Sequence, residues 1–468
     1  MRMRNKFIAL LLVFVFLFAL VSCGKKDGTV VQPTDPVYKK GEVAELNVYN
    51  WGEYISDGSE GSYNTNAEFE AYFNKYLSQK YGGVTVKVNY STYPTNEDMY
   101  SKLKNGASSY DVIIPSDYMI ERLIAEGMLY KFDIANDPIM TNYQYVMDEF
   151  KNAYYDPYNQ YSVPYTYGMV GIIYNKAMVD PEDVDEESER SWGLLWNPKY
   201  AGNILQFNNP RDAFATAMFW KGLNINSDEE EDWDVALELL KEQKPVLQGY
   251  VSDEIFDKMR GESAAIAPYY VGDFLTMAES QENLDFFFPT EGTNYFVDAM
   301  CIPISTKHPS IAKEYINFML SKEAAIANAE YLGYASPHSH VVNDPEYKAY
   351  MEDYAYTGQN GETAYDLLYN NSPDVVNAKY NALYANIDDP ACFRNFTPEI
   401  QARVNTLWED LKISGSTELW VHVTSIAIVV GVVAFAAYSI YTKKKRSRFY
   451  RERDKIKAFT KKKNVEKK

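Results

Sequence analysis

The chain has 468 residues and carries 46 basic against 65 acidic side chains, a formal net charge of −19. A surface with this surplus of negative charge repels nucleic acid and concentrates cations, so the composition argues against a nucleic-acid-binding role. Hydrophobic residues make up 46% of the chain, enough for a large core, and the length favours two lobes over one.

The first 22 residues are typical of an export signal. Three basic residues precede an apolar stretch of 15 residues at 7–21. That stretch is too short to cross a bilayer comfortably. Residues 20–23 resemble the lipobox of bacterial lipoproteins, which implies that Cys23 becomes the lipid-bearing N-terminus; an ordinary signal peptide with a chance cysteine is the alternative. Residues 23–44 are rich in lysine, glycine and proline and predict a flexible tether.

The next part of the chain alternates short apolar strands with helices. Residues 45–163 and 299–334 are predicted to form lobe 1. The alternation predicts a mostly parallel sheet that helices cover. The expected elements are a strand at 46–50, a helix at 69–77 ended by Gly82, a strand at 84–90, a helix opened by a capping box of Thr95 and Asp98, and a buried strand at 111–115.

The same alternation returns in lobe 2, which is predicted to comprise residues 164–298 and 335–415. Two extended segments, 161–175 and 295–304, are suited to crossing between the lobes. A helix at 311–320 would return to lobe 1, and a helix at 396–411 would be the last of the folded body. The other expected elements are strands at 204–207, 246–250, 264–270 and 284–289 and helices at 212–222 and 233–240.

A second membrane anchor is predicted near the C-terminus. Residues 419–441 are 23 residues without a formal charge, and a helix of that length would reach roughly 35 Å, enough to cross a bilayer. Interfacial aromatics flank it, and a basic tail follows at 442–468. The positive-inside rule then predicts a cytoplasmic tail and an external body, on the periplasmic or extracellular face.

The external body is more acidic than the whole chain. The tail from residue 443 carries 14 basic and 3 acidic side chains and the leader carries 3 basic ones, so the remaining chain holds 62 acidic against 29 basic residues, a net charge of −33. Most of these charges keep the domain soluble. The surplus nevertheless favours a cationic solute over an anionic one.

Few residues point to catalysis or to metal binding. Cys301 and Cys392 could pair in an external compartment, although the sequence leaves this open. His338 and His340 have no further metal ligands near them and predict a surface loop. The sequence contains no nucleophile elbow, phosphate-binding glycine loop or zinc-protease motif.

The most informative polar residues follow the predicted strands directly, where parallel sheets bind their ligands. Segments 49–54, 91–93, 116–118 and 208–212, together with Tyr250–Asp253 and Tyr270–Asp273, repeatedly offer an aromatic ring beside a carboxylate or hydroxyl. Rings attract cations and pack on methylene groups, and carboxylates pair with ammonium groups. An aliphatic chain with several amines meets both conditions.

An ordered series of segments resembles the spermidine/putrescine-binding proteins of ABC importers, over about residues 45–415. The segments are 49–54, 90–93, 96–97, 99–100, 113–116, 162–165, 289–292, 297–303 and 332–337. The resemblance implies an α/β, two-lobed periplasmic-binding-protein-like fold of type II. It implies a monomer that closes on a polyamine and passes it to a membrane permease, without a cofactor, a metal or an enzymatic activity.

The resemblance also implies a set of ligand-binding residues. Lobe 1 would contribute Trp51, Glu53, Tyr54, Ser91 and Tyr93; lobe 2 would contribute Asp212, Tyr270 and Asp273; and Phe296 and Asp298 would lie near the hinge. Asn209 stands where relatives often have aspartate, and Tyr270 where some have tryptophan. These departures leave the choice between spermidine and putrescine open.

Three other functions remain as alternatives. The first is a binder of the same fold for another cationic or small polar solute, such as an amino acid, a thiamine-like cation or a sugar. The second is a surface glycoside hydrolase, which needs two carboxylates at catalytic separation. The third is a purely structural envelope protein, which would not need an aromatic-lined cleft.

Overall fold

The computed structural model describes residues 31–414 except 107–108, 187–188, 354–355 and 359–360, together with residues 430, 432 and 438. The predicted export signal, the lipid site at Cys23 and the basic tail lie outside the described residues. So does most of the predicted span at 419–441, of which Val430, Val432 and Tyr438 are helical and exposed. No helix in the described part of the chain is both long and apolar enough to cross a bilayer.

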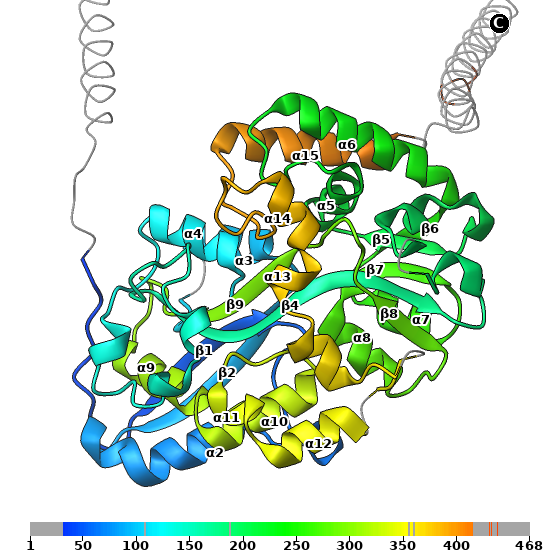
Figure 1. Ribbon diagram of the computed structural model, residues 1–468. Helices are drawn as coiled ribbons and strands as arrows, with labels where there is room; N and C mark the ends of the chain where they lie inside the picture. Colours follow the sequence, from blue (N-terminus) through cyan, green and yellow to red (C-terminus); the bar gives the residue numbers. More distant parts are fainter. Residues whose placement is uncertain are drawn as a thin grey trace, which may run out of the picture.

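In the described chain, nine strands form one continuous sheet with two halves (Figure 1). In the first half, β1 pairs in parallel with both β2 and β3; in the second, β5 pairs in parallel with β6 and β7. The strand bounds are β1 Val43–Trp51, β2 Thr85–Tyr93, β3 Val112–Ile113, β4 Ser162–Asn175, β5 Ile204–Phe207, β6 Leu247–Val251, β7 Ile266–Tyr270, β8 Leu284–Phe287 and β9 Tyr295–Cys301.

Two long strands join the halves, as the sequence predicts for 161–175 and 295–304. Residues 162–169 of β4 pair with β9, and residues 170–175 of β4 pair with β7 and β8. These pairings and that of β3 with β9 are antiparallel. The prediction of a mostly parallel sheet is therefore wrong for the centre of the molecule, because strands that cross between lobes and return along each other run in opposite directions.

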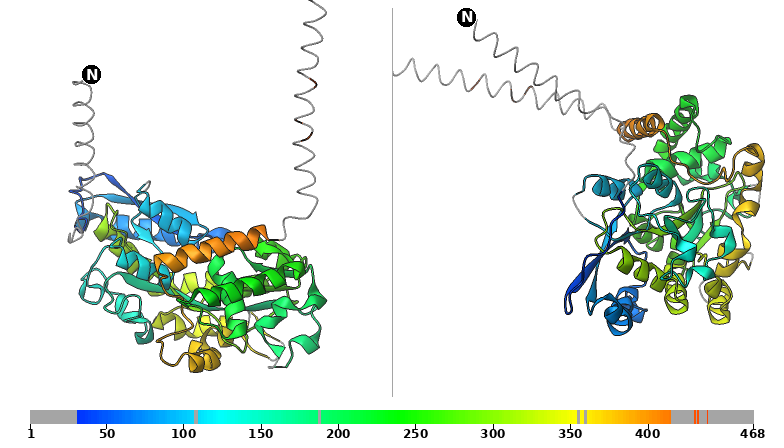
Figure 2. Two further views of the ribbon diagram at one scale, coloured as in Figure 1. Left: turned by 90° about the horizontal axis from the view of Figure 1, so that it is seen from above. Right: turned by 90° about the vertical axis from the view of Figure 1, so that its left-hand side faces the viewer.

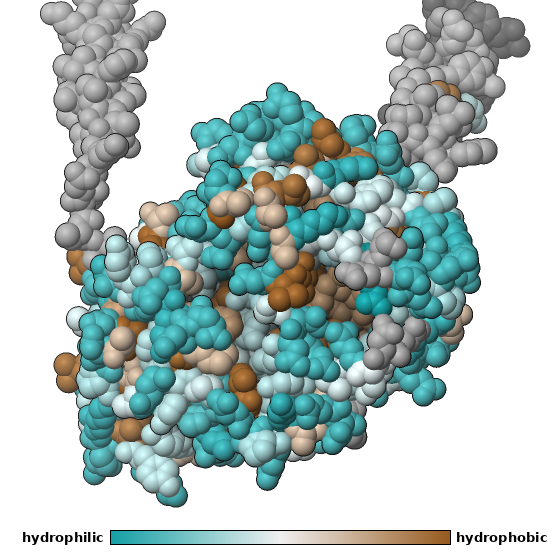
Figure 3. All heavy atoms as spheres, in the orientation of Figure 1, coloured by the Kyte–Doolittle hydropathy of each residue, from teal (hydrophilic) through white to brown (hydrophobic). Residues whose placement is uncertain are grey.

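Helices cover both halves of the sheet (Figures 1 and 2). Those of the first half are α2 Thr65–Tyr72, α3 Asn96–Lys104, α4 Asp117–Ala125, α9 Pro309–Met319 and α10 Lys322–Leu332. Those of the second half are α5 Pro210–Lys221, α6 Glu230–Gln243, α7 Glu254–Arg260, α8 Val271–Ala278 and α15 Pro398–Ile413. Shorter helices are α11 Ser339–Val342, α12 Pro345–Asp353, α13 Pro373–Val376 and α14 Ala378–Leu383. The outward face drawn in Figure 3 is largely hydrophilic, with hydrophobic side chains gathered near its middle.

Local sequence signals explain where the helices begin and end. Thr95 Oγ1 accepts a hydrogen bond from Asp98 N at 3.1 Å, so the predicted cap of α3 is confirmed. Asn209 Oδ1 accepts from Asp212 N at 2.9 Å and caps α5 in the same way. Asparagine and aspartate cap helices about equally well, so Asn209 keeps this function. Gly222 ends α5 in the left-handed conformation that glycine tolerates best.

The predicted helix at 69–77 is interrupted. The α-helix ends at Tyr72, and residues 73–77 form a π-turn that continues as a 3₁₀ turn up to Gly82. The side chain of Asn74 accepts from Val86 N at 2.8 Å, which fixes this wider turn against β2. The apolar period extends beyond the α-helix because the π-turn still directs Phe73 into the core.

The last part of the predicted tether is ordered. Asp35 Oδ1 accepts from Ser310 N at 3.1 Å at the start of α9, and the ring of Tyr38 stacks on His308 with centroids 5.7 Å apart. The prediction of a flexible tether up to residue 44 is therefore wrong for residues 35–44, since an aromatic and a carboxylate within it find partners on lobe 1.

Helix α15 packs along α6 in the second lobe (Figure 2). Lys244 Nζ donates to the carbonyl oxygen of Leu411 at 2.5 Å and to that of Ser414. Lys412 Nζ donates to Asn208 Oδ1 at 2.6 Å. Cations at the C-terminus of a helix satisfy its last carbonyl groups and oppose its dipole. The end of α15 is therefore held firmly on lobe 2.

The prediction that His338 and His340 lie in a surface loop is wrong for His338. His338 is buried rather than part of a surface loop, because its backbone bridges to Val146 and its ring packs beside Tyr145. Burial lowers its pKa to about 4. No group of three or more potential ligands in the described chain is arranged to hold a metal ion.

Cys301 and Cys392 are both buried free thiols, so the possible disulfide does not form. We expect the folded protein spanning 31–414 to react slowly with a thiol reagent and to expose both thiols in denaturant, because burial also raises the pKa of each thiol and suppresses its thiolate. Reagent titration with and without denaturant measures this. An unchanged melting temperature on adding reductant is the control, and a large loss of stability would contradict free thiols.

Candidate functional site

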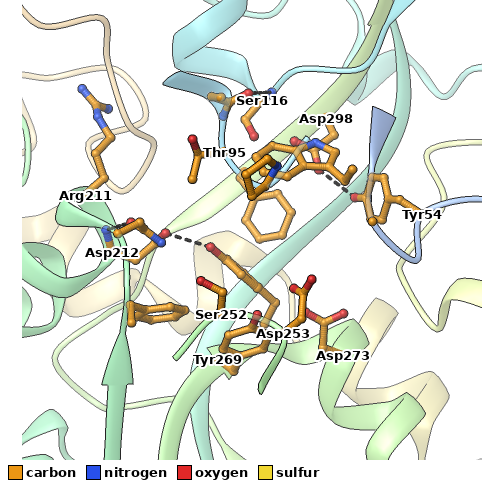
Figure 4. A pocket seen from close by; sticks show the side chains of 18 of the residues that line it. Tyr54, Thr95, Ser116, Arg211, Asp212, Ser252, Asp253, Tyr269, Asp273 and Asp298 are labelled. Atoms are coloured by element: carbon orange, nitrogen blue, oxygen red, sulfur yellow. Dashed lines mark hydrogen bonds between the residues drawn. The ribbon is translucent and has the colours of Figure 1, made fainter. Parts of the chain in front are cut away.

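The carboxyl ends of the parallel strands of both lobes open on one cleft, which β4 and β9 cross (Figure 4). Its cavity volume is about 170 Å³. A cavity needs roughly 10–15 Å³ by this measure to hold one water molecule. The cleft therefore has room for on the order of ten groups of that size, such as the methylene and amine groups of a small ligand. It therefore fits a small molecule and not a folded protein segment.

The cleft is strongly acidic. Seven carboxylates line it against a single arginine, Arg211, and no lysine or histidine is among the described lining residues. The acids are Glu53, Glu97, Asp117, Asp212, Asp253, Asp273 and Asp298. This surplus creates a negative potential that attracts cations and repels anions.

Aromatic rings form most of the remaining wall. They are Trp51, Tyr54, Tyr93, Tyr118, Phe207, Phe256, Tyr269, Tyr270, Phe296, Tyr334 and Phe393. Trp51 packs on Tyr93 with centroids 4.7 Å apart in lobe 1, and Tyr270 packs on Phe296 at 5.5 Å across the hinge. Such ring faces bind cations and methylene groups alike.

Hydrogen bonds hold the rings of lobe 1 by their polar edges. Trp51 Nε1 donates to the carbonyl oxygen of Ile114 at 2.9 Å, and Tyr93 OH donates to the same oxygen at 2.6 Å. Ile114 directly follows β3, so three neighbouring strands fix this wall. With their donors satisfied, these two side chains offer the cleft mainly their π-faces.

Asp298 lies in the floor of the cleft on β9 and is almost fully buried. Tyr54 OH donates to its Oδ2 at 2.7 Å and also contacts Thr166 of β4. Its Oδ1 meets no donor within hydrogen-bond geometry among the described residues, although the nearby Ser116 side chain lowers the pKa of the carboxyl. Burial raises the pKa of Asp298 to about 6. A buried acceptor oxygen without a partner is a position for a donor from a ligand.

The lobe 2 wall holds two further acids. Tyr270 OH donates to Asp212 Oδ2 at 2.8 Å, and burial raises the pKa of Asp212. Asp273, in the first turn of α8, is partly buried, and desolvation raises its pKa to about 7. In lobe 1, burial raises the pKa of Asp117 to about 8 although two backbone N–H groups donate to it. Each of these carboxylates is thus easier to ionise when a cation is present.

Glu53 lies at the exposed rim of the cleft in a strained backbone conformation. Its φ of 49° lies in the left-handed region that few non-glycine residues adopt. Such strain is typical of functional sites. The turn directs the chain from β1 back to Tyr54, whose ring then faces Asp298.

The structure brings nine of the ten sequence-predicted ligand residues to the cleft. They are Trp51, Glu53, Tyr54, Tyr93, Asp212, Tyr270, Asp273, Phe296 and Asp298. Ser91 is not among the lining residues: it is exposed on β2, an edge strand, and its Oγ lies 3.5 Å from the carbonyl oxygen of Val48. It lies two residues before the strand end, about 7 Å short of the cleft edge.

Four charged residues of the cleft are not among the ligand residues that the sequence predicts: Glu97, Asp117, Arg211 and Asp253. Asp117, Arg211 and Asp253 belong to the segments that directly follow predicted strands, so their position in the sequence indicates a place at the cleft. Glu97 lies in the first turn of α3, and only the position of that helix in the fold brings it to the cleft.

Comparisons with known proteins agree with this geometry. Residues 70–354 match the family described as bacterial extracellular solute-binding protein. The spermidine/putrescine-binding periplasmic protein of Escherichia coli is 30% identical over 293 residues, which cover 62% of this chain and 77% of the relative.

Solved structures give the same result. The PotD substrate-binding protein of a spermidine/putrescine ABC transporter from Streptococcus pneumoniae has a TM-score of 0.57 and 29% identity, covering 79% of this chain and 98% of that one. The Tp0655 (TpPotD) lipoprotein of Treponema pallidum has a TM-score of 0.55 and 25% identity, covering 73% and 99%.

Proposed function

Because this chain belongs to the bacterial extracellular solute-binding proteins, we propose that it captures a polyamine, spermidine or putrescine, and delivers it to an ABC importer. The observation that carries the proposal is the cleft of seven carboxylates with aromatic walls. A polyamine presents ammonium groups to the acids and methylene groups to the rings, so it satisfies both kinds of wall. A protein of this family binds its solute without converting it.

The nine lining residues predicted from the sequence are our proposed ligand contacts. Asp298 supplies a counter-charge in the floor, and Asp212 and Asp273 supply counter-charges from lobe 2. Trp51 and Tyr93 cover the methylene groups. A buried ammonium without a carboxylate would be prohibitively costly, so the acids fix where the nitrogen atoms lie.

We propose that the lobes close about β4 and β9, the two strands that join them. In this proposal, residues 45–163 and 299–334 move against residues 164–298 and 335–415. The ligand favours the closed form because it contacts both walls only when they approach. The monomeric closed form would then be the one that the permease accepts.

We further propose that both ends of the protein are held at the membrane. Cys23 would carry lipid, and residues 419–441 would span the bilayer, with 442–468 in the cytoplasm and the body outside. Two attachments would keep the binding protein close to its permease and raise its effective concentration there.

Thermal melts of the protein spanning 31–414 test the polyamine proposal. The segment 31–40 is kept because Asp35 and Tyr38 contact lobe 1. Spermidine or putrescine at about 100 times its Kd is expected to add roughly 2.7 kcal/mol to the free energy of unfolding.

Arginine, thiamine and maltose are the matched ligands. Each tests another solute class for the same cleft, and each is expected to leave the melting temperature unchanged. A rise with maltose or thiamine and none with either polyamine would contradict the proposal.

A further inference from the structure

The acidic cleft contains one positive side chain of its own. Arg211 lies in the first turn of α5, lines the cleft and is 5% exposed. Its Cζ lies 3.7 Å from the ring centroid of Phe396, 4.1 Å from that of Tyr118 and 5.0 Å from that of Phe393. Three rings therefore surround this guanidinium, and two of them, Tyr118 and Phe393, also line the cleft where a ligand ammonium could contact them.

The polar contacts of Arg211 are few. Nη2 donates to the carbonyl oxygen of Arg394 at 2.5 Å, whereas Nε and Nη1 are buried without a partner in the described structure. No carboxylate oxygen of the described residues lies within ion-pair distance of it. A guanidinium fixed mainly by structural demands would normally pair with a carboxylate.

Two acids of the cleft nevertheless face this end. Glu97 accepts from Tyr118 OH at 3.1 Å, and Asp117 precedes Tyr118 in α4. Both attract the Arg211 charge. Rings with carboxylates beside them are the surroundings that a terminal ammonium of a ligand requires, and here the chain itself supplies the cation.

Figure 4 shows how this end relates to the rest of the cleft. Arg211 lies on one side of the drawn side chains, and Asp253 and Asp273 lie on the opposite side, with the rings between them. The cleft thus has two acids on one side and its single positive side chain on the other. A ligand that extends toward Arg211 therefore meets like charge.

We propose that Arg211 determines specificity by limiting the length of the polyamine that the cleft accepts. It occupies the terminal cation position between Tyr118, Phe393 and Phe396 and leaves the remaining positions to the ligand. This inference rests on the proposed function. Removing the guanidinium vacates that position and leaves Glu97 and Asp117 without their counter-charge, so longer polyamines gain a contact.

The test measures Kd by calorimetry for putrescine, octane-1,8-diamine and dodecane-1,12-diamine, which carry the same two ammonium groups and differ only in length. In the intact protein, affinity is expected to fall from the shortest to the longest diamine. Arg211→Met is expected to raise affinity for dodecane diamine, relative to putrescine, at least tenfold. Arg211→Lys keeps the charge but uncovers the Phe396 ring. It is expected to change the affinity for dodecane diamine, relative to putrescine, at least threefold, and it provides the test if Arg211→Met does not fold.

Arg394→Met is the matched control. Arg394 lies between Phe393 and Phe396, and its guanidinium stacks on the ring of Tyr154 at 3.4 Å without lining the cleft. The ratio of the Kd values for long and short diamines is therefore expected to stay that of the intact protein. An Arg211 variant with an unchanged ratio, or an equal shift in the Arg394 variant, overturns the role of Arg211 and leaves polyamine binding intact. Failure of the intact protein to bind any diamine or spermidine overturns the proposed function itself.

Discussion

Asp298→Asn is expected to weaken polyamine binding at least 100-fold and, at the same time, to stabilise the unliganded protein. The carboxylate is 5% exposed, and its Oδ1 meets no donor within hydrogen-bond geometry among the described residues. Removing one member of a buried charge pair costs about 3–5 kcal/mol, and each 1.4 kcal/mol is tenfold in affinity. Without ligand the same buried charge is stabilised only by the hydroxyl groups of Tyr54 and Ser116, so the neutral amide is expected to add about 1 kcal/mol to the free energy of unfolding.

Asp156→Asn is the matched control for this prediction. Asp156 is equally buried, but the N–H groups of Gln160, Tyr161 and Ser162 and the Ser162 hydroxyl all donate to it. Its loss is expected to lower stability and to leave affinity within a few-fold of the parent. Calorimetric Kd values and melting temperatures of the two variants distinguish these outcomes. An Asp298 variant that binds like the parent would remove this residue from the proposed site.

Polyamine affinity is expected to fall by about 10- to 100-fold when the pH is lowered from 8 to 5.5. Burial places the pKa of Asp298 at about 6 and that of Asp273 at about 7 in the unliganded cleft. An ammonium group with a pKa of about 10 stays charged over this range, while the carboxyls take up protons that binding must displace. Binding near neutral pH is therefore expected to release protons.

Calorimetry in two buffers with different ionisation enthalpies counts the released protons. The stability of the unliganded protein is expected to depend on pH in the opposite direction to its polyamine affinity. These carboxyls have pKa values above the roughly 3.9 of an unfolded aspartate, so the folded state binds more protons and their contribution to stability decreases as pH rises from about 4 to 8. An affinity that is equal at pH 5.5 and 8, or greater at 5.5, would contradict the assignment. Asp298→Asn is expected to flatten the part of the profile near pH 6.

Hydrophobic periodicity and strand-end positions allowed much of this molecule to be predicted from its sequence. The crossing strands at 161–175 and 295–304 could be identified because they are long apolar runs without a helical period. The rule that ligands lie at the carboxyl ends of parallel strands located Asp212, Asp273 and the turn after β1. These predictions depend on the pattern of neighbouring residues along the chain, which can be read from the sequence itself.

Other features depend on the partners that folding brings together. Ser91 resembles a ligand residue in sequence, but its strand lies at the edge of the sheet and exposes it. His338 follows no local pattern that predicts burial, yet its backbone bridges to Val146 and its ring packs beside Tyr145. The cage around Arg211 combines a ring from α4 with two rings that precede α15, and no local pattern joins residues so far apart in the chain.

The two ends of the folded body belong to different lobes: Asp35 and Tyr38 secure the start on lobe 1, whereas Lys244 and Lys412 secure the end of α15 on lobe 2. With both ends attached to the bilayer as proposed, opening of the lobes would change the distance between the start of lobe 1 and the end of α15, and the predicted tether at 23–34 would supply the slack. The length of that tether, rather than the fold, would then set how far the two lobes can separate at the bilayer surface.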